Sequence, residues 1–413
     1  MTIRVRVGGV NVDDGGAAAG VALSALAGGL AIGYLHGVGG RMHEILLLGA
    51  GKIGRAIAKL LGHSGDYRVL VGDVDERSLS RLAGIPNVTT RRVDVTEDGS
   101  LRAAMRGRAS VLSACSFAVN PGIARAALGE GLSYFDLTED VATTRAVREL
   151  SAQARPGQVF MPQCGLAPGF IAIAGHHLAK QFERLDDVRL RVGALAQFPT
   201  GELKYNLTWS TDGLINEYCN PCEVIHDGRK IEVQPLEGLE HFALDGVDYE
   251  AFNTSGGLGT LWETFDGKVR NLDYKTVRYR GHRDLMAFLV NELRLSSRRD
   301  VLKDILERAV PGTVQDVVLV FVMVTGWKDG VFTQVTDARK IYHDTVLGEA
   351  WSGIQITTAS SLCAVVDLHH SGALPATGFL RQEQVDLPAF LANRFGQAYN
   401  NQHHTTAPGT SLA

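Results

Sequence analysis

The sequence predicts an α/β fold: a doubly wound parallel sheet followed by a second α+β domain built on a mixed sheet. Two observations carry this prediction. Short apolar runs alternate with helix-like stretches between residues 43 and 162, which is typical of parallel strands joined by right-handed crossover helices. From Asp187 onward, strand-like runs separated by loops take over. They include the continuous apolar run 317–324, which is far too short to span a membrane.

The first strand, turn and helix carry a glycine motif. Residues 45–48 form an apolar run, residues 49–54 are Gly-Ala-Gly-Lys-Ile-Gly, residues 55–61 have helical apolar spacing, and the run 67–71 leads to Asp73. The first glycine permits the tight turn, the second lets the backbone approach a pyrophosphate, and the third lets the helix pack on the strand. With the phosphates at the helix N-terminus, this order predicts a Rossmann-type dinucleotide site.

An acid about 20 residues beyond the motif is expected to select the cofactor. Asp73 would accept hydrogen bonds from the adenosine ribose and repel a 2′-phosphate, which favours NAD, whereas Arg77 leaves NADP open. Further contacts are expected where the parallel strands end. The residues predicted to contact the dinucleotide are Gly49, Ala50, Gly51, Lys52, Ile53, Gly54, Asp73, Asp94, Val95, Ala114, Cys115, Ser116, Leu166 and Ala167.

The remaining elements follow in order. The fourth helix of the first half is predicted with Asn120 as its N-cap and Pro121 at its first position, and Pro168 with Gly169 breaks the alternation before the second half. Strands are predicted over residues 89–95, 109–114, 134–137, 158–162, 188–196, 223–226, 230–233 and 317–324, and helices over residues 78–83, 98–105, 121–128, 141–154, 170–181 and 349–371.

The chain divides into five parts. Residues 1–41 are predicted to be a disordered or wrongly assigned extension, because the dinucleotide fold begins directly after Met42. Residues 15–40 lack Asp, Glu, Lys and Arg, but nine of them are glycine and no basic cluster flanks them, so a membrane anchor is the less favoured alternative. The other parts are a dinucleotide domain, a substrate domain, a C-terminal helical segment returning to the first domain and a loose tail, over residues 42–165, 166–340, 341–400 and 401–413.

The composition gives no sign of a nucleic-acid, membrane or metal partner. The 413 residues include 41 basic and 45 acidic side chains, so a net charge of −4 gives no reason to expect nucleic acid or an anionic membrane surface. Five scattered cysteines suit a reducing compartment, which predicts a cytoplasmic protein without disulfides. Cys219 and Cys222 have metal-like spacing but lack two further ligands, so no metal site is predicted.

Several motifs together resemble a known family. The glycine motif at Gly49 is followed by Phe-Asp-Leu-Thr-Glu at 135–139, Gly-Leu-Ala-Pro-Gly at 165–169, Thr-Ser-Gly-Gly at 254–257 and Arg-Tyr-Arg-Gly-His at 278–282. In this order they resemble the saccharopine dehydrogenase family. Segments 206–228 and 253–282 are most similar to its lysine 6-dehydrogenase branch, and the resemblance covers about residues 42–395.

The resemblance implies a two-domain oxidoreductase that acts on a C–N bond of an amino acid, with the nicotinamide in the cleft between the domains. It further implies an enzyme that oxidises the terminal amine of L-lysine, releasing ammonia and an aldehyde that cyclises, and a dimer or larger homo-oligomer. One alternative is a secondary-amine substrate such as saccharopine or a carboxylated polyamine. An alternative of another class is a nucleotide-sensing protein without turnover.

Three residues are candidates for acid–base chemistry, because an amine loses hydride only when its nitrogen is deprotonated. Asp136 and Glu139 end the fifth strand of the sheet and are candidate proton acceptors, although strand-end capping would also explain them. His282 has the pKa class of a general acid or base, but a lone histidine is more often structural.

The remaining candidates would bind substrate. Arg278, followed by Tyr279, is a candidate clamp for a carboxylate, with a surface ion pair as the alternative. Thr254 and Ser255 have hydroxyls that would bind substrate, unless the segment is only a glycine turn. The residues predicted to wall an aliphatic chain, unless they are core, are Trp209 and Tyr205. A second substrate carboxylate would require a second buried cation from the set Lys204, Lys275, Arg280 and Arg283.

Overall fold

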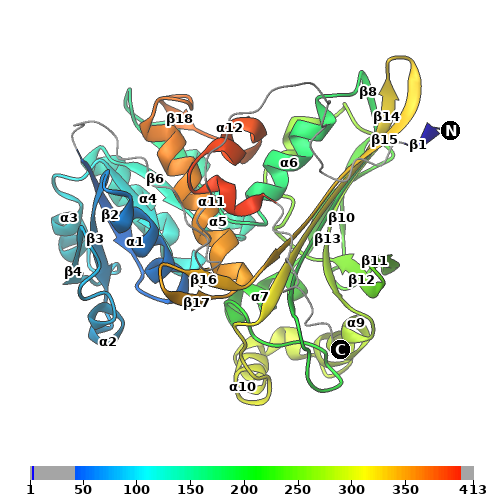
Figure 1. Cartoon of the computed structure of the whole chain (residues 1–413), viewed down its shortest axis with the longest axis horizontal. Coiled ribbons are helices and arrows are strands. Elements are labelled where there is room, and N and C mark those ends of the chain that lie inside the picture. Colours follow the sequence, from blue (N-terminus) through cyan, green and yellow to red (C-terminus); the bar gives the residue numbers. More distant parts are fainter. Residues whose placement is uncertain (1, 4–41, 401–413) are drawn as a thin grey trace, which may run out of the picture.

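Two β-sheets face each other across a layer of helices (Figure 1). The structure is a computed structural model that describes residues 2–3 and 42–400. The proposed extension, apart from Thr2–Ile3, and the proposed tail 401–413 lie outside the described residues. Thr2–Ile3 form strand β1, which pairs with the second sheet, so this part of the predicted disordered extension is a strand.

The first sheet has seven parallel strands in the order β18-β7-β6-β5-β2-β3-β4. It confirms the predicted doubly wound α/β fold. Its strands are β2 (His43–Leu48), β3 (Tyr67–Asp73), β4 (Val88–Arg92), β5 (Ser110–Ser113), β6 (Ser133–Asp136), β7 (Val159–Met161) and β18 (Gly378–Phe379). Its helices are α1 (Lys52–Ser64), α2 (Glu76–Ser80), α3 (Asp98–Met105), η1 (Phe117–Val119), α4 (Asn120–Glu130) and α5 (Val141–Ser151).

Central strand β2 shows why this sheet forms. Its apolar residues are fully buried, with Ile45 and Leu47 in one core cluster and Leu46 and Leu48 in another. Successive side chains of a strand point to opposite faces, so a sheet covered by helices on both sides needs such a continuous apolar run.

The second sheet is mixed and has nine strands, as predicted for the second domain. Its main order is β1-β15-β14-β8-β13-β12-β11, and a hairpin of β9 and β10 joins at β13. Its strands after β1 are β8 (Arg184–Ala196), β9 (Cys222–His226), β10 (Arg229–Val233), β11 (Glu240–Leu244), β12 (Val247–Asn253), β13 (Asn271–Tyr279), β14 (Asp316–Lys328) and β15 (Val331–Tyr342). Helices in this part are α6 (Phe170–Ala179), α7 (Thr211–Cys219), α8 (Leu261–Phe265), α9 (His282–Ala287), η2 (Phe288–Glu292), η3 (Leu295–Ser297) and α10 (Arg299–Ala309).

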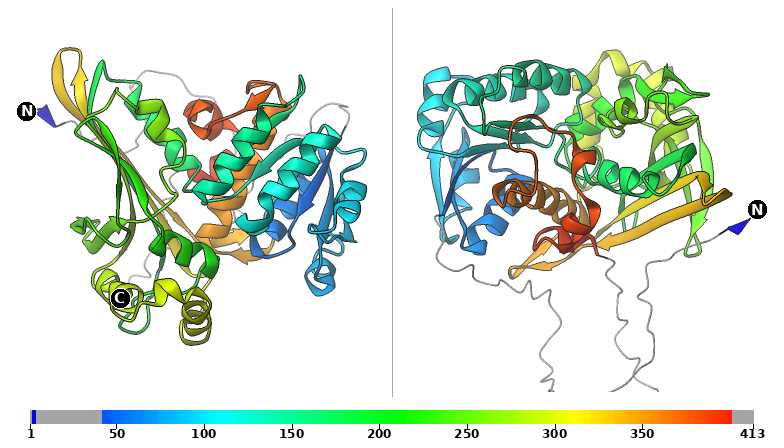
Figure 2. Two further views of the ribbon diagram at one scale, coloured as in Figure 1. Left: turned by 180° about the vertical axis from the view of Figure 1, so that it is seen from behind. Right: turned by 90° about the horizontal axis from the view of Figure 1, so that it is seen from above.

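Helix α11 (Gly353–His370) runs between the two sheets (Figure 2). At its start, Asp316 of β14 accepts hydrogen bonds from the backbone N–H groups of Gly353 and Ile354. Near its end, Asp367 accepts a 2.7 Å hydrogen bond from the Tyr67 hydroxyl of β3. The helix is therefore fixed to one sheet at each end, which fixes the wall that it contributes to the space between them.

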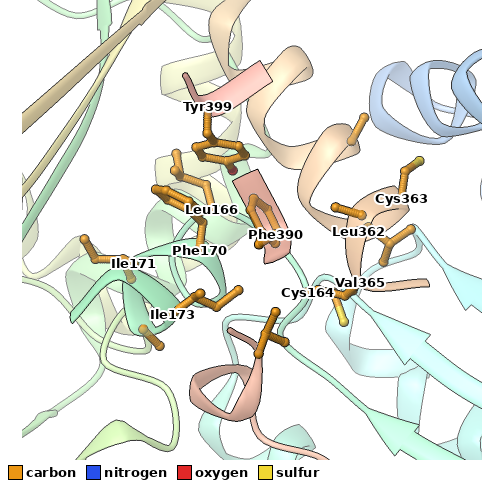
Figure 3. Packing of buried hydrophobic residues seen from close by; sticks show 14 of the residues in the cluster. Cys164, Leu166, Phe170, Ile171, Ile173, Leu362, Cys363, Val365, Phe390 and Tyr399 are labelled. Carbon is orange, nitrogen blue, oxygen red and sulfur yellow. The ribbon is translucent and has the colours of Figure 1, made fainter. Parts of the chain in front are cut away.

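Aromatic residues from the end of the chain fill the layer between the sheets (Figure 3). The ring of Tyr399 stacks on Phe170 of α6 at 3.8 Å between centroids, and Phe390 packs against both rings. The elements of this segment besides α11 and β18 are β16 (Asp344–Val346), β17 (Glu349–Trp351), η4 (Gln382–Gln384), α12 (Leu387–Ala392) and η5 (Gly396–Tyr399).

Two local predictions are wrong. Residues 349–351 form a hairpin strand rather than the first turn of a helix, because Leu347 and Gly348 both have positive φ and make a tight turn before Glu349. Asn120 is the first residue of α4 and not its N-cap, since its side chain accepts a 2.7 Å hydrogen bond from Ser113 instead of binding the helix backbone. No helix within residues 42–400 is long and apolar enough to cross a membrane.

Candidate active site between the two sheets

A cavity of about 500 Å³ lies between the carboxyl ends of the first sheet's strands and the inner face of the second sheet. The first domain contributes the glycine turn and the loops after β5, β6 and β7, and the second contributes β8, β13 and α7. The lining residues are Gly51, Lys52, Ile53, Gly54, Ala114, Cys115, Ser116, Phe117, Leu137, Glu139, Gly165, Leu166, Ala167, Pro168, Val192, Ala194, Thr208, Trp209, Ser210, Asp212, Glu217, Tyr274, Thr276, Arg278, Ile354 and Thr358. Open α/β sheets bind ligands at this edge.

The glycine turn at one end of the cavity fits a dinucleotide. A side chain on Gly49 would meet the carbonyl oxygen of Ala114 at 2.8 Å, and one on Gly54 would meet the carbonyl oxygen of Gly49 at 1.9 Å. By contrast, a side chain on Gly51 would meet nothing within 4 Å, and no side chain caps α1. Two glycines therefore close the turn, and the third leaves open space where the helix presents its first N–H groups to phosphate.

The predicted cofactor residues fall into two groups. Nine of them line the cavity: Gly51, Lys52, Ile53, Gly54, Ala114, Cys115, Ser116, Leu166 and Ala167. Gly49, Ala50, Asp73, Asp94 and Val95 do not line it. Asp73 fixes the turn, because its carboxylate accepts hydrogen bonds from the Ala50 N–H at 2.6 Å and the Asp75 N–H at 2.8 Å.

Glu139 is the carboxylate that the first domain presents to the cavity. It follows β6, and its Oε1 atom is buried without a hydrogen-bond partner among the described residues. Burial raises the pKa of Glu139 to about 7. A buried polar atom without a partner is costly, so its place in a cavity wall indicates a ligand or water that completes it.

Asp136, three residues earlier, lies elsewhere than predicted. It is fully buried, does not line the cavity, and accepts hydrogen bonds from the Tyr134 hydroxyl and the N–H groups of Thr138 and Gln163 at 2.7–3.0 Å. Burial raises the pKa of Asp136 to about 6, against the effect of these donors. Its oxygens hold the end of β6 to the β7 loop, so Asp136 positions the segment that carries Glu139 and is not placed to contact substrate.

The Thr-Ser-Gly-Gly segment lies behind the cavity wall and does not line it. Thr254 pairs with the Thr276 hydroxyl at 2.7 Å, and the Ser255 hydroxyl donates to the carbonyl of Pro221. A side chain on Gly256 would meet the carbonyl oxygen of Glu139 at 2.2 Å, and one on Gly257 would meet the ring of Tyr274 at 2.2 Å. The glycines thus allow close packing behind two cavity residues, and Thr254 and Ser255 lie outside the lining of the cavity in which substrate contacts were predicted.

Arg278 is the cation of the second-domain wall, and only 3% of it is exposed. Its Nε donates to the Tyr218 hydroxyl at 3.0 Å, its Nη1 donates to the Val277 carbonyl at 2.8 Å, and its guanidinium lies 5.1 Å from the ring centroid of Tyr205. Both of these hydrogen bonds go to uncharged oxygens, and Glu217 acts on the guanidinium only through space. A buried guanidinium without a hydrogen-bonded anion is costly, which makes it a candidate anion site.

His282 lies behind this arginine and not in the cavity. Its Nε2 is 3.1 Å from the Tyr218 hydroxyl and its Nδ1 is 2.9 Å from the Leu203 carbonyl. This network assigns the proton to Nδ1, so that Nε2 accepts from Tyr218. Burial and the Arg278 charge lower the pKa of His282 to about 3. A neutral histidine with both nitrogens bonded orients Tyr218 and is not placed for the predicted acid–base role.

Of the remaining predicted substrate residues, one lines the cavity and two do not. Trp209 lines the cavity, whereas Tyr205 lies beneath Arg278 and does not line it. Tyr279 points to the other face of β13, where its hydroxyl donates to the Ala196 carbonyl at 2.8 Å. Because neighbouring strand residues face opposite sides, Arg278 and Tyr279 cannot both reach the same cavity.

Two cavity carboxylates, Asp212 and Glu217 of α7, were missed from the sequence, and only Glu217 is buried. Glu217 of α7 is 6% exposed, lines the cavity, and receives no hydrogen bond on its carboxylate from any residue in the described ranges. Burial is the largest effect on its pKa and raises it to about 8, with Arg278 lowering and Glu139 raising it. The available signal was a lone acid between the apolar pair Leu214 and Ile215 and the aromatic Tyr218.

Comparisons with known proteins agree with this arrangement. The family model described as Saccharopine dehydrogenase C-terminal domain matches residues 165–396, and the one described as Saccharopine dehydrogenase NADP binding domain matches residues 45–161. The NADP(+)-dependent, L-glutamate-forming saccharopine dehydrogenase of Saccharomyces cerevisiae is 26% identical over 209 residues, which are 48% of this chain and 45% of that protein. This chain thus spans less than half the length of that curated relative in the match.

A solved structure shares the fold. The apo form of saccharopine dehydrogenase (L-Glu forming) from Saccharomyces cerevisiae matches with a TM-score of 0.68 and 16% identity, covering 86% of this chain and 96% of that one. At this identity the match shows a shared fold. The two family-model matches, over residues 45–161 and 165–396, show that this chain belongs to the saccharopine dehydrogenase family.

Proposed function

We propose that this chain is an NAD-dependent dehydrogenase that oxidises the terminal amine of L-lysine, or of a close analogue with one carboxylate. The observation that carries this proposal is Arg278, a buried guanidinium in the cavity wall whose hydrogen bonds go to the Tyr218 hydroxyl and the Val277 carbonyl and not to an acid. Guanidinium binds carboxylate through two parallel hydrogen bonds, so Arg278 is suited to bind a substrate carboxylate.

The acids of the cavity support an amine as the second group of the substrate. At neutral pH the terminal amine of lysine is protonated, and its proton must leave before the neighbouring carbon can lose hydride. Glu139 has a pKa near 7 and an oxygen without a partner in the described chain, and it lies on the wall that carries the glycine turn. These properties suit a proton acceptor beside the reacting carbon.

The overall chemistry balances as follows. A bound dinucleotide would supply the acceptor for the hydride of the terminal carbon. Glu139 takes a proton from the nitrogen, and loss of that proton and of the hydride leaves a C=N bond in the substrate. Water then adds to that carbon and ammonia leaves, giving an aldehyde. Condensation of the aldehyde with the α-amine releases water and closes a six-membered imine. Glu139 is placed to pass its proton onward while water adds.

The cations of the cavity argue against substrates with several carboxylates, because Lys52, which lines the cavity besides Arg278, belongs to the dinucleotide turn. None of the four candidate second cations lines the cavity: Lys204, Lys275, Arg280 and Arg283. Lys275 donates to the Gly238 carbonyl at 2.6 Å and pairs with Glu240 at 2.9 Å. Along the strand it alternates with Tyr274 and Thr276, which face the cavity, so it points to the opposite face. Saccharopine or a carboxylated polyamine is therefore the less favoured substrate.

The remaining properties are also proposals. The carboxylate of Asp73 supports NAD over NADP, since a 2′-phosphate next to it would be repelled. A cytoplasmic homodimer is proposed, with the face of the second sheet opposite to the cavity as the interface. That face carries neighbouring aromatic rings from three strands, Phe242, Tyr249 and Tyr279. Sedimentation of the purified protein would report its mass in solution.

The decisive experiment follows NADH absorbance with purified protein, NAD and L-lysine at about pH 9, where more amine is neutral. We expect NADH and ammonia in equal amounts, and a loss of about 10²- to 10⁴-fold in kcat for Glu139→Gln, the usual range for a general base. Glu149→Gln, an exposed acid on α5, is the matched control and should leave kcat unchanged.

Two other outcomes would contradict the proposed function. Turnover of saccharopine or a carboxylated polyamine, but not of lysine, would contradict the proposed substrate. Bound dinucleotide without turnover over a broad panel of amines would contradict an enzymatic function and favour a nucleotide sensor.

A further inference from the structure

The second-domain wall of the cavity presents a buried acid and a buried cation that do not pair with each other. Glu217 and Arg278 both line the cavity and are both nearly fully buried, and the hydrogen bonds of Arg278 go to Tyr218 and Val277 instead of to Glu217. The Arg278 charge nevertheless acts on Glu217, which places the two groups near each other. Two opposite charges held close but apart, on the wall of one cavity, are complementary to a ligand that carries both signs.

An α-amino acid carries both signs on one carbon. Its ammonium and its carboxylate are each attached to the α-carbon, so they point away from it in different directions. We propose that Glu217 binds the α-ammonium of the substrate while Arg278 binds its α-carboxylate, which makes Glu217 the residue that selects an α-amino acid over a simple amine or amino-carboxylate. This inference rests on the proposed function, which it deepens by naming the group that each wall recognises.

The position of Glu217 is fixed by its surroundings. Its backbone carbonyl accepts a 2.9 Å hydrogen bond from the Ser255 N–H, and Ser210 caps the start of its helix at the Gly213 N–H. Leu214 and Tyr218 of the same helix are buried in a core cluster. The helix therefore cannot turn the carboxylate away from the cavity without breaking these contacts.

With the α-ammonium and the α-carboxylate bound by the second domain, the terminal amine of the substrate would face the first domain. With Arg278 and Glu217 on the second-domain wall, Glu139 is the acid that remains beside the glycine turn. Trp209 and Tyr274 also line the cavity and offer ring surface for the methylene chain between the two ends. In this orientation the α-carbon lies against the second sheet and the terminal amine reaches Glu139.

The test compares two substrates in the full-length protein. 6-Aminohexanoate has the carboxylate and the terminal amine of lysine but no α-amine. We expect wild-type kcat/KM to favour lysine by about 10- to 100-fold, the usual effect of one hydrogen bond to a charged group. In Glu217→Gln, kcat/KM for lysine should fall to about the 6-aminohexanoate value, mainly through KM, and the value for 6-aminohexanoate should hardly change. Glu232→Gln on β10 is an exposed control that should keep the preference.

Each result has a separate meaning. If Glu217→Gln keeps the wild-type preference for lysine, or loses both substrates equally, Glu217 does not bind the α-ammonium. Thermal unfolding and dinucleotide binding of the variant verify that it is folded. If wild-type protein turns over neither substrate, the proposed function fails. The inference is then still decided by protection against thermal unfolding, which should be stronger with lysine than with 6-aminohexanoate in wild type only.

Discussion

Gly256→Ala tests whether the segment behind Glu139 sets the position of that acid. Gly256 has a φ of +85°, and a Cβ atom there would lie 2.2 Å from the carbonyl oxygen of Glu139. Carbon and oxygen atoms that do not bond pack at about 3.5 Å, so the loop or the Glu139 backbone must shift by about 1 Å. A displacement of this size at a reacting group costs about 10²-fold in rate.

Gly246→Ala is the matched control. Gly246 lies in the turn between β11 and β12 with a φ of +76°, and a Cβ atom there would meet nothing within 4 Å. Both substitutions place alanine in the left-handed region, which costs about 1–2 kcal/mol of stability. Only Gly256→Ala adds the contact with Glu139.

The assay measures kcat for NADH formation with lysine well below both unfolding transitions, together with dinucleotide affinity and Tm. We expect kcat to fall about 10²-fold in Gly256→Ala and to stay at the wild-type level in Gly246→Ala, with dinucleotide affinity unchanged in both. A Gly256→Ala protein that is folded and retains wild-type kcat would refute the argument that this packing positions Glu139.

Three further predictions concern single groups. Asp73→Ser removes the charge proposed to lie beside the ribose. The ratio of kcat/KM for NADP to kcat/KM for NAD should then rise by about tenfold or more. An unchanged ratio would show that Asp73 does not select the cofactor. In Asp136→Asn, one of the two accepting oxygens becomes a donating NH₂ group, although Tyr134, Thr138 and Gln163 all donate to this side chain. Chemical denaturation should therefore show a loss of about 2–4 kcal/mol in unfolding free energy. Glu139 accepts a proton and Glu217 binds ammonium only when each is ionised, so kcat/KM should fall as the pH drops through about 8 to 7. The His282→Asn variant should show the same fall, because the pKa of His282 is lowered to about 3. A pH limb that disappears in His282→Asn would instead assign it to the histidine.

The first domain was predictable from the sequence because its signals are local. Strand β2 is buried on both faces, and this appears as a continuous apolar run whatever the rest of the chain does. The glycines at 49, 51 and 54 are required by contacts within one turn and with the next strand, so their spacing alone specifies the dinucleotide end of the site. The strand order of the first sheet confirmed the doubly wound fold, and the match of the family model to residues 45–161 confirmed the family.

The other half of the site depends on contacts between distant segments. Asp136 and Glu139 are three residues apart and chemically alike, yet only the packing of the β7 loop decides that the first is enclosed and the second faces the cavity. Arg278 and Tyr279 are neighbours whose faces are set by the register of β13 on β8. A residue type does not reveal which face of a sheet will be covered.

Glu217 shows this limit most clearly. The other acid of its short helix, Asp212, pairs with Lys303, and no pattern in the sequence separates the two. The role of Glu217 appears only when α7 packs beside β13 and brings it near Arg278. The fold class and the dinucleotide turn were predictable from the sequence, because they follow from local periodicity and backbone sterics, and the family was predictable from its resemblance in five short motifs. The tertiary structure decided which acids and which cation meet in the cavity, because charge and burial depend on neighbours that the folded chain brings from far along the sequence.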